Sequence, residues 1–100
     1  MTKVLGIALA LAVVAAGGPS VERGRALFRD KALGTNGRSC ASCHEGGKRF
    51  DELGEYDDKR LGAYANTCIE GMLKGKPLPP DSVDLRSLVL YLRTFQMERR

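Results

Sequence analysis

Three residues near the middle of the chain have the types and the spacing that bind a cofactor. Cys40 and Cys43 lie three positions apart and His44 follows directly, so the stretch reads C-x-x-C-H. This pattern is typical of c-type haem attachment, in which the two thiols add to two vinyl groups of one porphyrin and the adjacent imidazole ligates its iron. The sequence therefore predicts one covalently attached haem c, held through Cys40 and Cys43, with His44 as an axial ligand.

Other uses of paired cysteines fit this sequence less well. A thioredoxin-like motif needs a βαβ setting, whereas the residues before Cys40 have loop character and no strand-rich segment lies nearby. A zinc site needs four ligands, and only Cys68 remains as a further sulfur or nitrogen ligand. A disulfide between Cys40 and Cys43 would leave Cys68 as an odd thiol. Haem attachment is the favoured interpretation.

The first 18 residues have the layout of a secretory signal peptide. Lys3 gives a positive start, the 13 residues from Val4 to Ala16 are apolar apart from Gly6, and small residues follow. The apolar run is shorter than the roughly 20 residues that a membrane span needs. We expect a signal peptide over residues 1–18 and an exported, periplasmic domain over residues 19–100. An uncleaved N-terminal anchor is the alternative, and membrane contact is expected only in that case.

Size and charge narrow the class of protein. The domain that remains is small, and a core of that size rarely holds together without a staple such as a covalently bound cofactor. The net charge of +4 comes from 16 Lys and Arg interleaved with 12 Asp and Glu, as on an ordinary solvated surface, and does not indicate nucleic-acid binding. We expect redox proteins as partners. A basic rim of Lys48, Arg49, Lys74 and Lys76 could steer an acidic one.

Apolar residues recur at helical spacing in three segments, and no stretch alternates with period two. The sequence therefore predicts an all-α domain. Its helices are expected from Val21 until the turn at Gly34, over residues 59–73, and from the region of residues 81–82 toward the end of the chain. The expected N-caps are Ser20 for the first helix and Asp57 or Asp58 for the second, and the last helix is expected to begin at Asp81 or Ser82.

With these residues in view, the chain resembles small class I c-type cytochromes over about residues 20–97. The elements in common are Gly24-x-x-Leu27-Phe28 in the first helix, the C-x-x-C-H motif, and the apolar run around Tyr91 in the last helix. The resemblance implies a cytochrome c-like helical domain wrapped around one haem, which carries single electrons. It also implies that the first and last helices cross closely, with Gly24 against Tyr91.

The chain departs from that family at the second axial ligand. Class I members usually have methionine just before the Pro-Pro turn, whereas this chain has Leu78, and leucine cannot ligate iron. Met72 is the preferred sixth ligand, Cys68 on the same helix face is the alternative, and Met97 is a third candidate. The stretch from Cys68 to Leu78 is also similar to cytochrome domains of thiosulfate-oxidising enzymes, in some of which a cysteine ligates the haem.

Two functions from different classes follow. The favoured hypothesis is a periplasmic electron-transfer protein that cycles iron between the ferric and ferrous forms and is not an enzyme. The alternative is a haem enzyme, or a subunit of one, that acts on a sulfur compound through Cys68, and a ligand-binding sensor with an open sixth position is a weaker third. The electron carrier is favoured because so small a domain leaves little material for a substrate pocket, and its single histidine is committed to iron.

Overall fold

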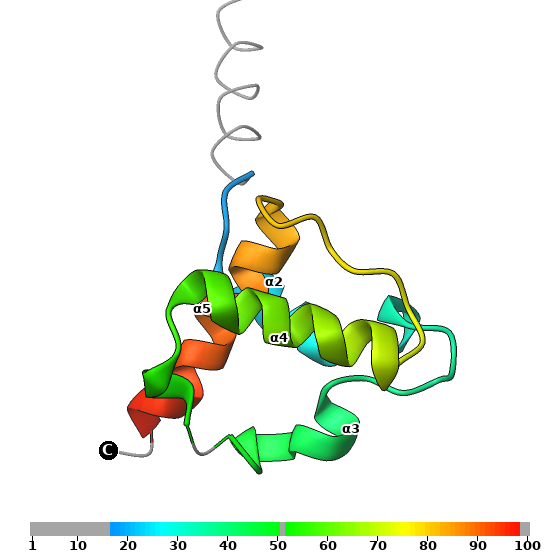
Figure 1. Cartoon of the computed structure of the whole chain (residues 1–100), viewed down its shortest axis with the longest axis horizontal. Coiled ribbons are helices and arrows are strands. Elements are labelled where there is room, and N and C mark those ends of the chain that lie inside the picture. The colour runs from blue at the N-terminus through cyan, green and yellow to red at the C-terminus, as the bar shows by residue number, and fades with distance from the viewer. Residues whose placement is uncertain (1–16, 51, 99–100) are drawn as a thin grey trace, which may run out of the picture.

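The computed structural model describes residues 17–50 and 52–98, and in these ranges the chain forms helices and turns without a strand. The α-helices are α2 (Val21–Phe28), α3 (Ala41–His44), α4 (Asp58–Gly71) and α5 (Val83–Glu98), and single 3₁₀ turns cover Lys31–Leu33, Glu45–Gly47 and Leu53–Glu55. Figure 1 shows α4 lying across α2 and α5, with α3 apart from them below α4. The predicted all-α fold is confirmed for the described part.

The predicted signal peptide falls mostly within residues 1–16, which lie outside the described residues. None of the helices in the described part of the chain is long and apolar enough to cross a membrane.

The three longer helices begin where the sequence predicts. In each, a Ser or Asp oxygen accepts the backbone N–H three residues later, which satisfies one of the free donors of the first turn. The capping residues are Ser20, Asp57 and Ser82, with N···O distances of 3.0, 2.8 and 3.1 Å. The choices that the sequence left open are thereby settled in favour of Asp57 and Ser82.

The first helix ends earlier than expected. The prediction extended it to the turn at Gly34, but α2 ends at Phe28. The side chain of Asp30 accepts the N–H of Ala32 at 2.8 Å and so starts a separate 3₁₀ turn. Asp competes with the helical backbone in this way because its carboxylate reaches the N–H two residues along.

The end of α4 is also tighter than expected. The helix ends at Gly71 rather than at Leu73. The chain then turns through Lys74, whose φ of 59° lies in the left-handed region, and Gly75 N–H donates to the carbonyl of Ile69 at 2.8 Å. A lysine in this conformation is strained, because a Cβ crowds the following carbonyl there.

The helices α2 and α5 cross at Gly24. A Cβ on Gly24 would overlap the backbone carbonyl of Ser87 and lie 2.6 Å from the Cβ of Tyr91. The Ser87 side chain is fully buried there, and its Oγ accepts the N–H of Ser20 at 3.0 Å. The expected contact between Gly24 and Tyr91 is therefore present, and only glycine leaves enough room for it.

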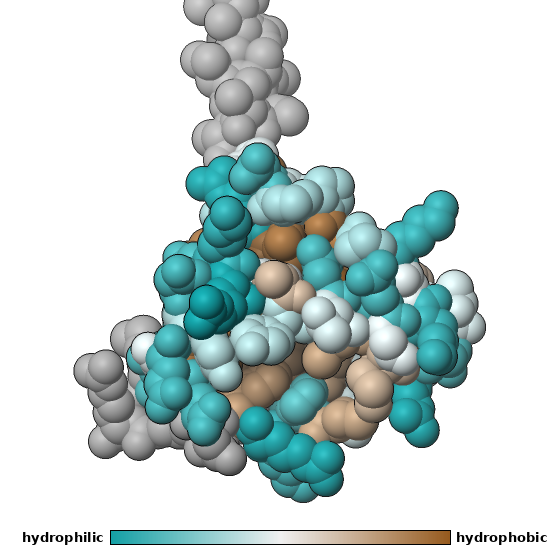
Figure 2. Space-filling model, viewed as in Figure 1, coloured by the Kyte–Doolittle hydropathy of each residue, from teal (hydrophilic) through white to brown (hydrophobic). Residues whose placement is uncertain are grey.

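The core lies between α2, α5 and one face of α4. Phe28 packs against Tyr91 and Phe95, with ring centroids 5.2 and 5.5 Å apart, in edge-on and tilted arrangements that aromatic pairs favour. The remaining buried apolar side chains of this cluster are Leu27, Leu53, Leu61, Ile69, Leu73, Leu88, Val89 and Leu92. On the side below α4, apolar side chains reach the surface (Figure 2).

Candidate cofactor site

A cavity of about 580 Å³ opens between α3, α4 and the loops around them. Its volume is in the range of small-molecule and cofactor sites, and its lining is largely apolar. The structure brings the predicted site residues together here, because Cys40, Cys43, His44, Cys68 and Met72 all line this cavity. The side chain of Met97, the third candidate ligand, lies outside the described part.

The attachment motif forms a single helical turn. Cys40 precedes α3 and accepts the N–H of His44 at 3.0 Å. The Oγ of Ser42 accepts the N–H of Ser39 at 2.9 Å and closes the turn from inside. A turn of helix brings residues three apart to one face, and Cys40 and Cys43 accordingly both line the cavity.

The imidazole of His44 is oriented by the backbone. Its Nδ1 lies 2.8 Å from the carbonyl oxygen of Lys48. A carbonyl can only accept, so Nδ1 carries the proton and donates, which leaves Nε2 as the nitrogen with a free lone pair. The ring also stacks on Phe50, with centroids 4.3 Å apart. Metal-ligating histidines are fixed by this kind of hydrogen bond.

The loop after His44 curls tightly to place that carbonyl. Gly46, Gly47 and Arg49 all have φ in the left-handed region, at 68°, 83° and 70°. A Cβ on Gly47 would lie 2.8 Å from the ring of Phe95, so the loop also packs closely on α5.

Cys68 and Met72 lie one turn apart at the end of α4 and line the facing side of the cavity. Burial raises the pKa of the Cys40 thiol to about 11, and the neighbouring Cys68 contributes to the shift. Burial also raises the pKa of Cys68, with a contribution from Cys43. Both shifts favour the neutral form of these thiols.

Thr35 and Asn36, in the loop before the C-x-x-C-H motif, bond to the backbone at the end of α4. Thr35 donates through its N–H to Leu73 O at 2.9 Å and through its hydroxyl to Lys74 O at 2.7 Å. Asn36 Nδ2 donates to the carbonyl of Met72 at 2.8 Å. These bonds fix Met72 relative to the cysteines. The sequence identified this segment only as a turn, because nothing local indicates a partner 36 residues away.

Leu78, which stands where the resembled family has methionine, is held away from this role. Its N–H donates to Asn66 Oδ1 and its carbonyl accepts from Asn66 Nδ2, both at 2.8 Å. Leu78 packs against the core and is not among the described residues that line the cavity.

The polar lining of the cavity is sparse. Arg49 is the one cationic side chain among the described lining residues, and Tyr56 and Tyr64 lie beside each other with ring centroids 4.9 Å apart. These three side chains and the hydroxyl of Ser39 are donors that a carboxylate on a bound cofactor could use. Lys48, the neighbour of Arg49 in the predicted basic rim, is exposed but does not line the cavity.

The donor set fits a haem. Within residues 17–50 and 52–98, no group of three or more His, Cys, Asp or Glu side chains is placed to hold a metal ion by itself. A haem iron needs fewer ligands from the protein, because the porphyrin supplies four and the protein only the axial ones. His44 and the sulfurs of Cys68 and Met72 are of the types that serve as axial ligands, and they line one cavity together with Cys40 and Cys43.

Comparison with family models, curated proteins and solved structures finds no match to this chain.

Proposed function

We propose that this protein is an exported electron carrier that holds one c-type haem in the cavity, bound covalently through Cys40 and Cys43 and ligated by His44. The observation that carries the proposal is the meeting, around one largely apolar cavity, of the C-x-x-C-H turn and the sulfur-bearing end of α4. It acts in the periplasm on redox proteins, after removal of the N-terminal segment, and not on nucleic acid.

The residues of the chain orient and shield the cofactor. When bound, the haem supplies one-electron chemistry through its iron. The Lys48 carbonyl keeps the proton on Nδ1 of His44 and so presents Nε2 to the metal. Leu53, Leu61 and Leu92 provide apolar lining that excludes water from the ring. Such burial disfavours the extra charge of the ferric state and raises the reduction potential.

Met72 is the proposed sixth ligand. Its side chain is 56% exposed, although it lies on the cavity and the next residue, Leu73, is buried. A bound haem would cover this thioether. The backbone of Met72 is fixed by Asn36, which is what an axial ligand at a helix end requires. Iron with both axial positions filled has no place for a substrate, which favours a carrier over an enzyme.

Cys68 carries the second candidate function. It lines the cavity one helical turn before Met72, and its thiol lies near those of the attachment motif. A thiolate ligand or a reactive thiol there would suit a haem enzyme that acts on a sulfur compound.

The test compares Met72→Ala with Cys68→Ser in the purified haem protein. We expect the reduced wild-type protein and the Cys68→Ser variant to resist carbon monoxide and to share one absorption spectrum, because Met72 fills the sixth position. The Met72→Ala variant should bind carbon monoxide quickly and fully. If Cys68→Ser changes the spectrum and Met72→Ala does not, the sulfur-compound enzyme becomes the better account. Rapid binding by the wild type would reject the electron carrier.

A further inference from the structure

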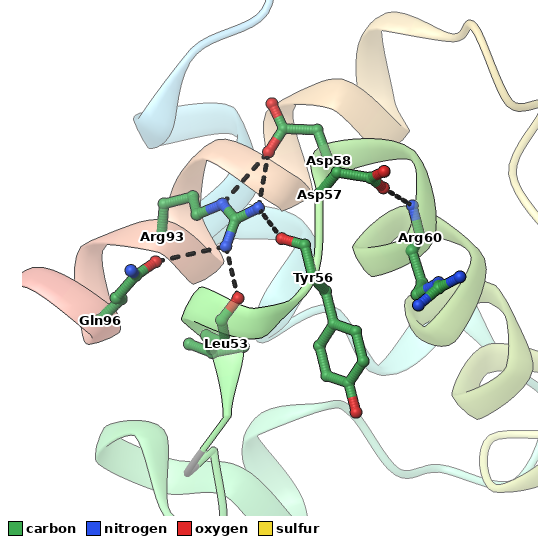
Figure 3. Close-up of polar contacts among 7 residues, drawn as sticks. All are labelled: Leu53, Tyr56, Asp57, Asp58, Arg60, Arg93 and Gln96. Atoms are coloured by element: carbon green, nitrogen blue, oxygen red, sulfur yellow. Dashed lines mark hydrogen bonds and ion pairs between the residues drawn. The ribbon is translucent and has the colours of Figure 1, made fainter.

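Arg93 on α5 makes more hydrogen bonds than any other side chain in the described part of the protein (Figure 3). Its Nη1 donates to the carbonyl of Leu53 and its Nη2 to the carbonyl of Tyr56, both at 2.6 Å. Nε and Nη2 donate to Asp58 Oδ1 at 3.1 and 2.9 Å, and Nη1 donates to Gln96 Oε1 at 3.2 Å. A guanidinium has five N–H donors, and all of them are used.

The two carbonyls belong to the segment of residues 52–57, which leads into α4 and forms part of the cavity wall. Leu53 is buried and lines the cavity, and Tyr56 lines it beside Tyr64. Arg93 therefore fixes the backbone at two of the three positions of the segment that line the cavity, the third being Glu52. Asp58, the first residue of α4, extends this anchor to the start of the helix.

This segment has little apolar packing of its own. Leu53 is its one buried residue and Tyr56 is half-buried, while the other four positions are exposed. The planar guanidinium fork is suited to bridging two carbonyls and a carboxylate at once. The ammonium of a lysine has three donors on a flexible stem and cannot reproduce that geometry.

We infer that Arg93 is a positioning residue, which holds the Leu53–Tyr56 wall against the bound cofactor and keeps water from its edge. The inference rests on the proposed haem function. Without Arg93, the wall loosens, water reaches the ring, and the ferric state gains stability. The reduction potential should then fall, and small ligands should reach the iron more easily.

The closing experiment compares Arg93→Lys and Arg93→Gln with the same changes at Arg23. Arg23 is a matched control, because its Nε and Nη2 form a two-bond contact with Asp84 at 2.9 and 3.1 Å. That contact joins α2 to α5, and neither partner lines the cavity. An Asp58→Asn variant tests whether the charge near Arg93, rather than the position of the 52–57 segment, sets the reduction potential. It removes a negative charge, but its amide oxygen still accepts from Arg93.

Three readouts are taken on the haem-loaded full chain: the midpoint potential, imidazole binding to the ferric protein, and amide hydrogen exchange over residues 52–57. For both Arg93 variants we expect a lower potential, imidazole binding tighter by about tenfold (about 1.4 kcal/mol), and faster exchange in the segment. The Arg23 variants should leave all three near wild type. Because Arg93→Lys retains the positive charge, a fall in its potential comes from position rather than charge. Asp58→Asn should move the potential little.

Two results would overturn the inference while leaving the proposed function intact. In one, exchange rises in the Arg93 variants but potential and imidazole binding stay at wild-type values, so that Arg93 is only structural. In the other, the Arg23 variants shift the potential as much as the Arg93 variants do. A wild-type protein that carries no covalent haem refutes the proposed function itself, and this inference with it.

Discussion

The crossing of α2 and α5 and the wall of the cavity are built in different ways. At the crossing, two helices touch through Gly24, and apolar side chains such as Phe28 and Leu88 fill the space beside the contact. Around the cavity, the chain runs through one-turn helices and loops. These are held by polar side chains that reach distant backbone groups, as Asn36 and Arg93 do.

The two regions also differ in how well they bury their apolar side chains without a ligand. The crossing buries its apolar residues against each other, and a Ser20–Ser87 hydrogen bond and the Arg23–Asp84 ion pair join the same two helices. Two large apolar side chains that line the cavity are exposed to solvent, Tyr64 by 51% and Met72 by 56%. Hydrogen bonds to the backbone give the cavity wall its shape, and a bound ring would supply the missing apolar contacts.

The largest expected effect on stability is at the crossing. A Gly24→Val change puts methyl groups where the Ser87 carbonyl and the Tyr91 Cβ already lie, and overpacking of this kind costs about 3 kcal/mol. The urea midpoint of the haem-loaded protein should fall accordingly. Gly71→Ala on α4 is the control. A Cβ there meets nothing within 4 Å, so stability should stay or rise by less than about 1 kcal/mol. Equal losses in both variants would mean that the crossing is not specially close-packed.

The next prediction concerns Asn66, whose side chain holds the backbone of the loop after α4 by two hydrogen bonds. Asn66→Ala leaves the N–H and the carbonyl of Leu78 without their partner, and we expect a loss of about 2 kcal/mol in the free energy of unfolding. Thr67→Ala is the neighbouring control. Its hydroxyl only bonds the carbonyl of Ala63 within the same exposed helix turn, so the change should be within about 0.5 kcal/mol. A negligible effect at Asn66 would contradict this expectation, because the loop after α4 would then not depend on these hydrogen bonds.

Features set by neighbouring residues could be predicted from the sequence, whereas features set by competing or distant groups could not. The cap at Ser20 and the choice between Asp57 and Asp58 follow from local chemistry and helical periodicity, so they could be predicted. The close approach of Gly24 to Tyr91 is implied only by the resemblance to class I c-type cytochromes. The end of α2 could not be predicted, because the Asp30 side chain starts a competing turn.

The cavity shows a similar division. Cys40, Cys43 and His44 stand out by type and spacing, and the face of α4 that carries Met72 follows from its period. Arg93 has no such signal. It lies 40 residues from Leu53 and 37 from Tyr56 and bonds their carbonyls, which are the same in every residue type. The role of such a residue becomes visible only when the fold brings the distant backbone to it.

The smallest expected effect concerns the strained backbone beside the cavity. Lys74 has φ of 59°, and Lys74→Gly should raise stability by about 1 kcal/mol, because glycine adopts this conformation without a steric penalty. The hydrogen bond from Thr35 goes to the carbonyl of residue 74 and is retained. Lys76→Gly is the control and should bring no gain, since Lys76 is not among the described residues with positive φ. Thermal unfolding of both variants measures the difference, and a loss at Lys74→Gly would show that its side chain matters more than the strain.

The mass of the denatured, exported protein tests most directly whether the chain carries a covalent haem. We expect a chain that is heavier by one haem, with the haem retained after unfolding and solvent extraction because thioether bonds hold it to Cys40 and Cys43. The Cys40→Ser, Cys43→Ser double variant should lose all of it, whereas Cys68→Ser should keep it. A wild-type chain with the mass of its amino acids alone, purified from cells that attach haem to other proteins, would contradict the central claim.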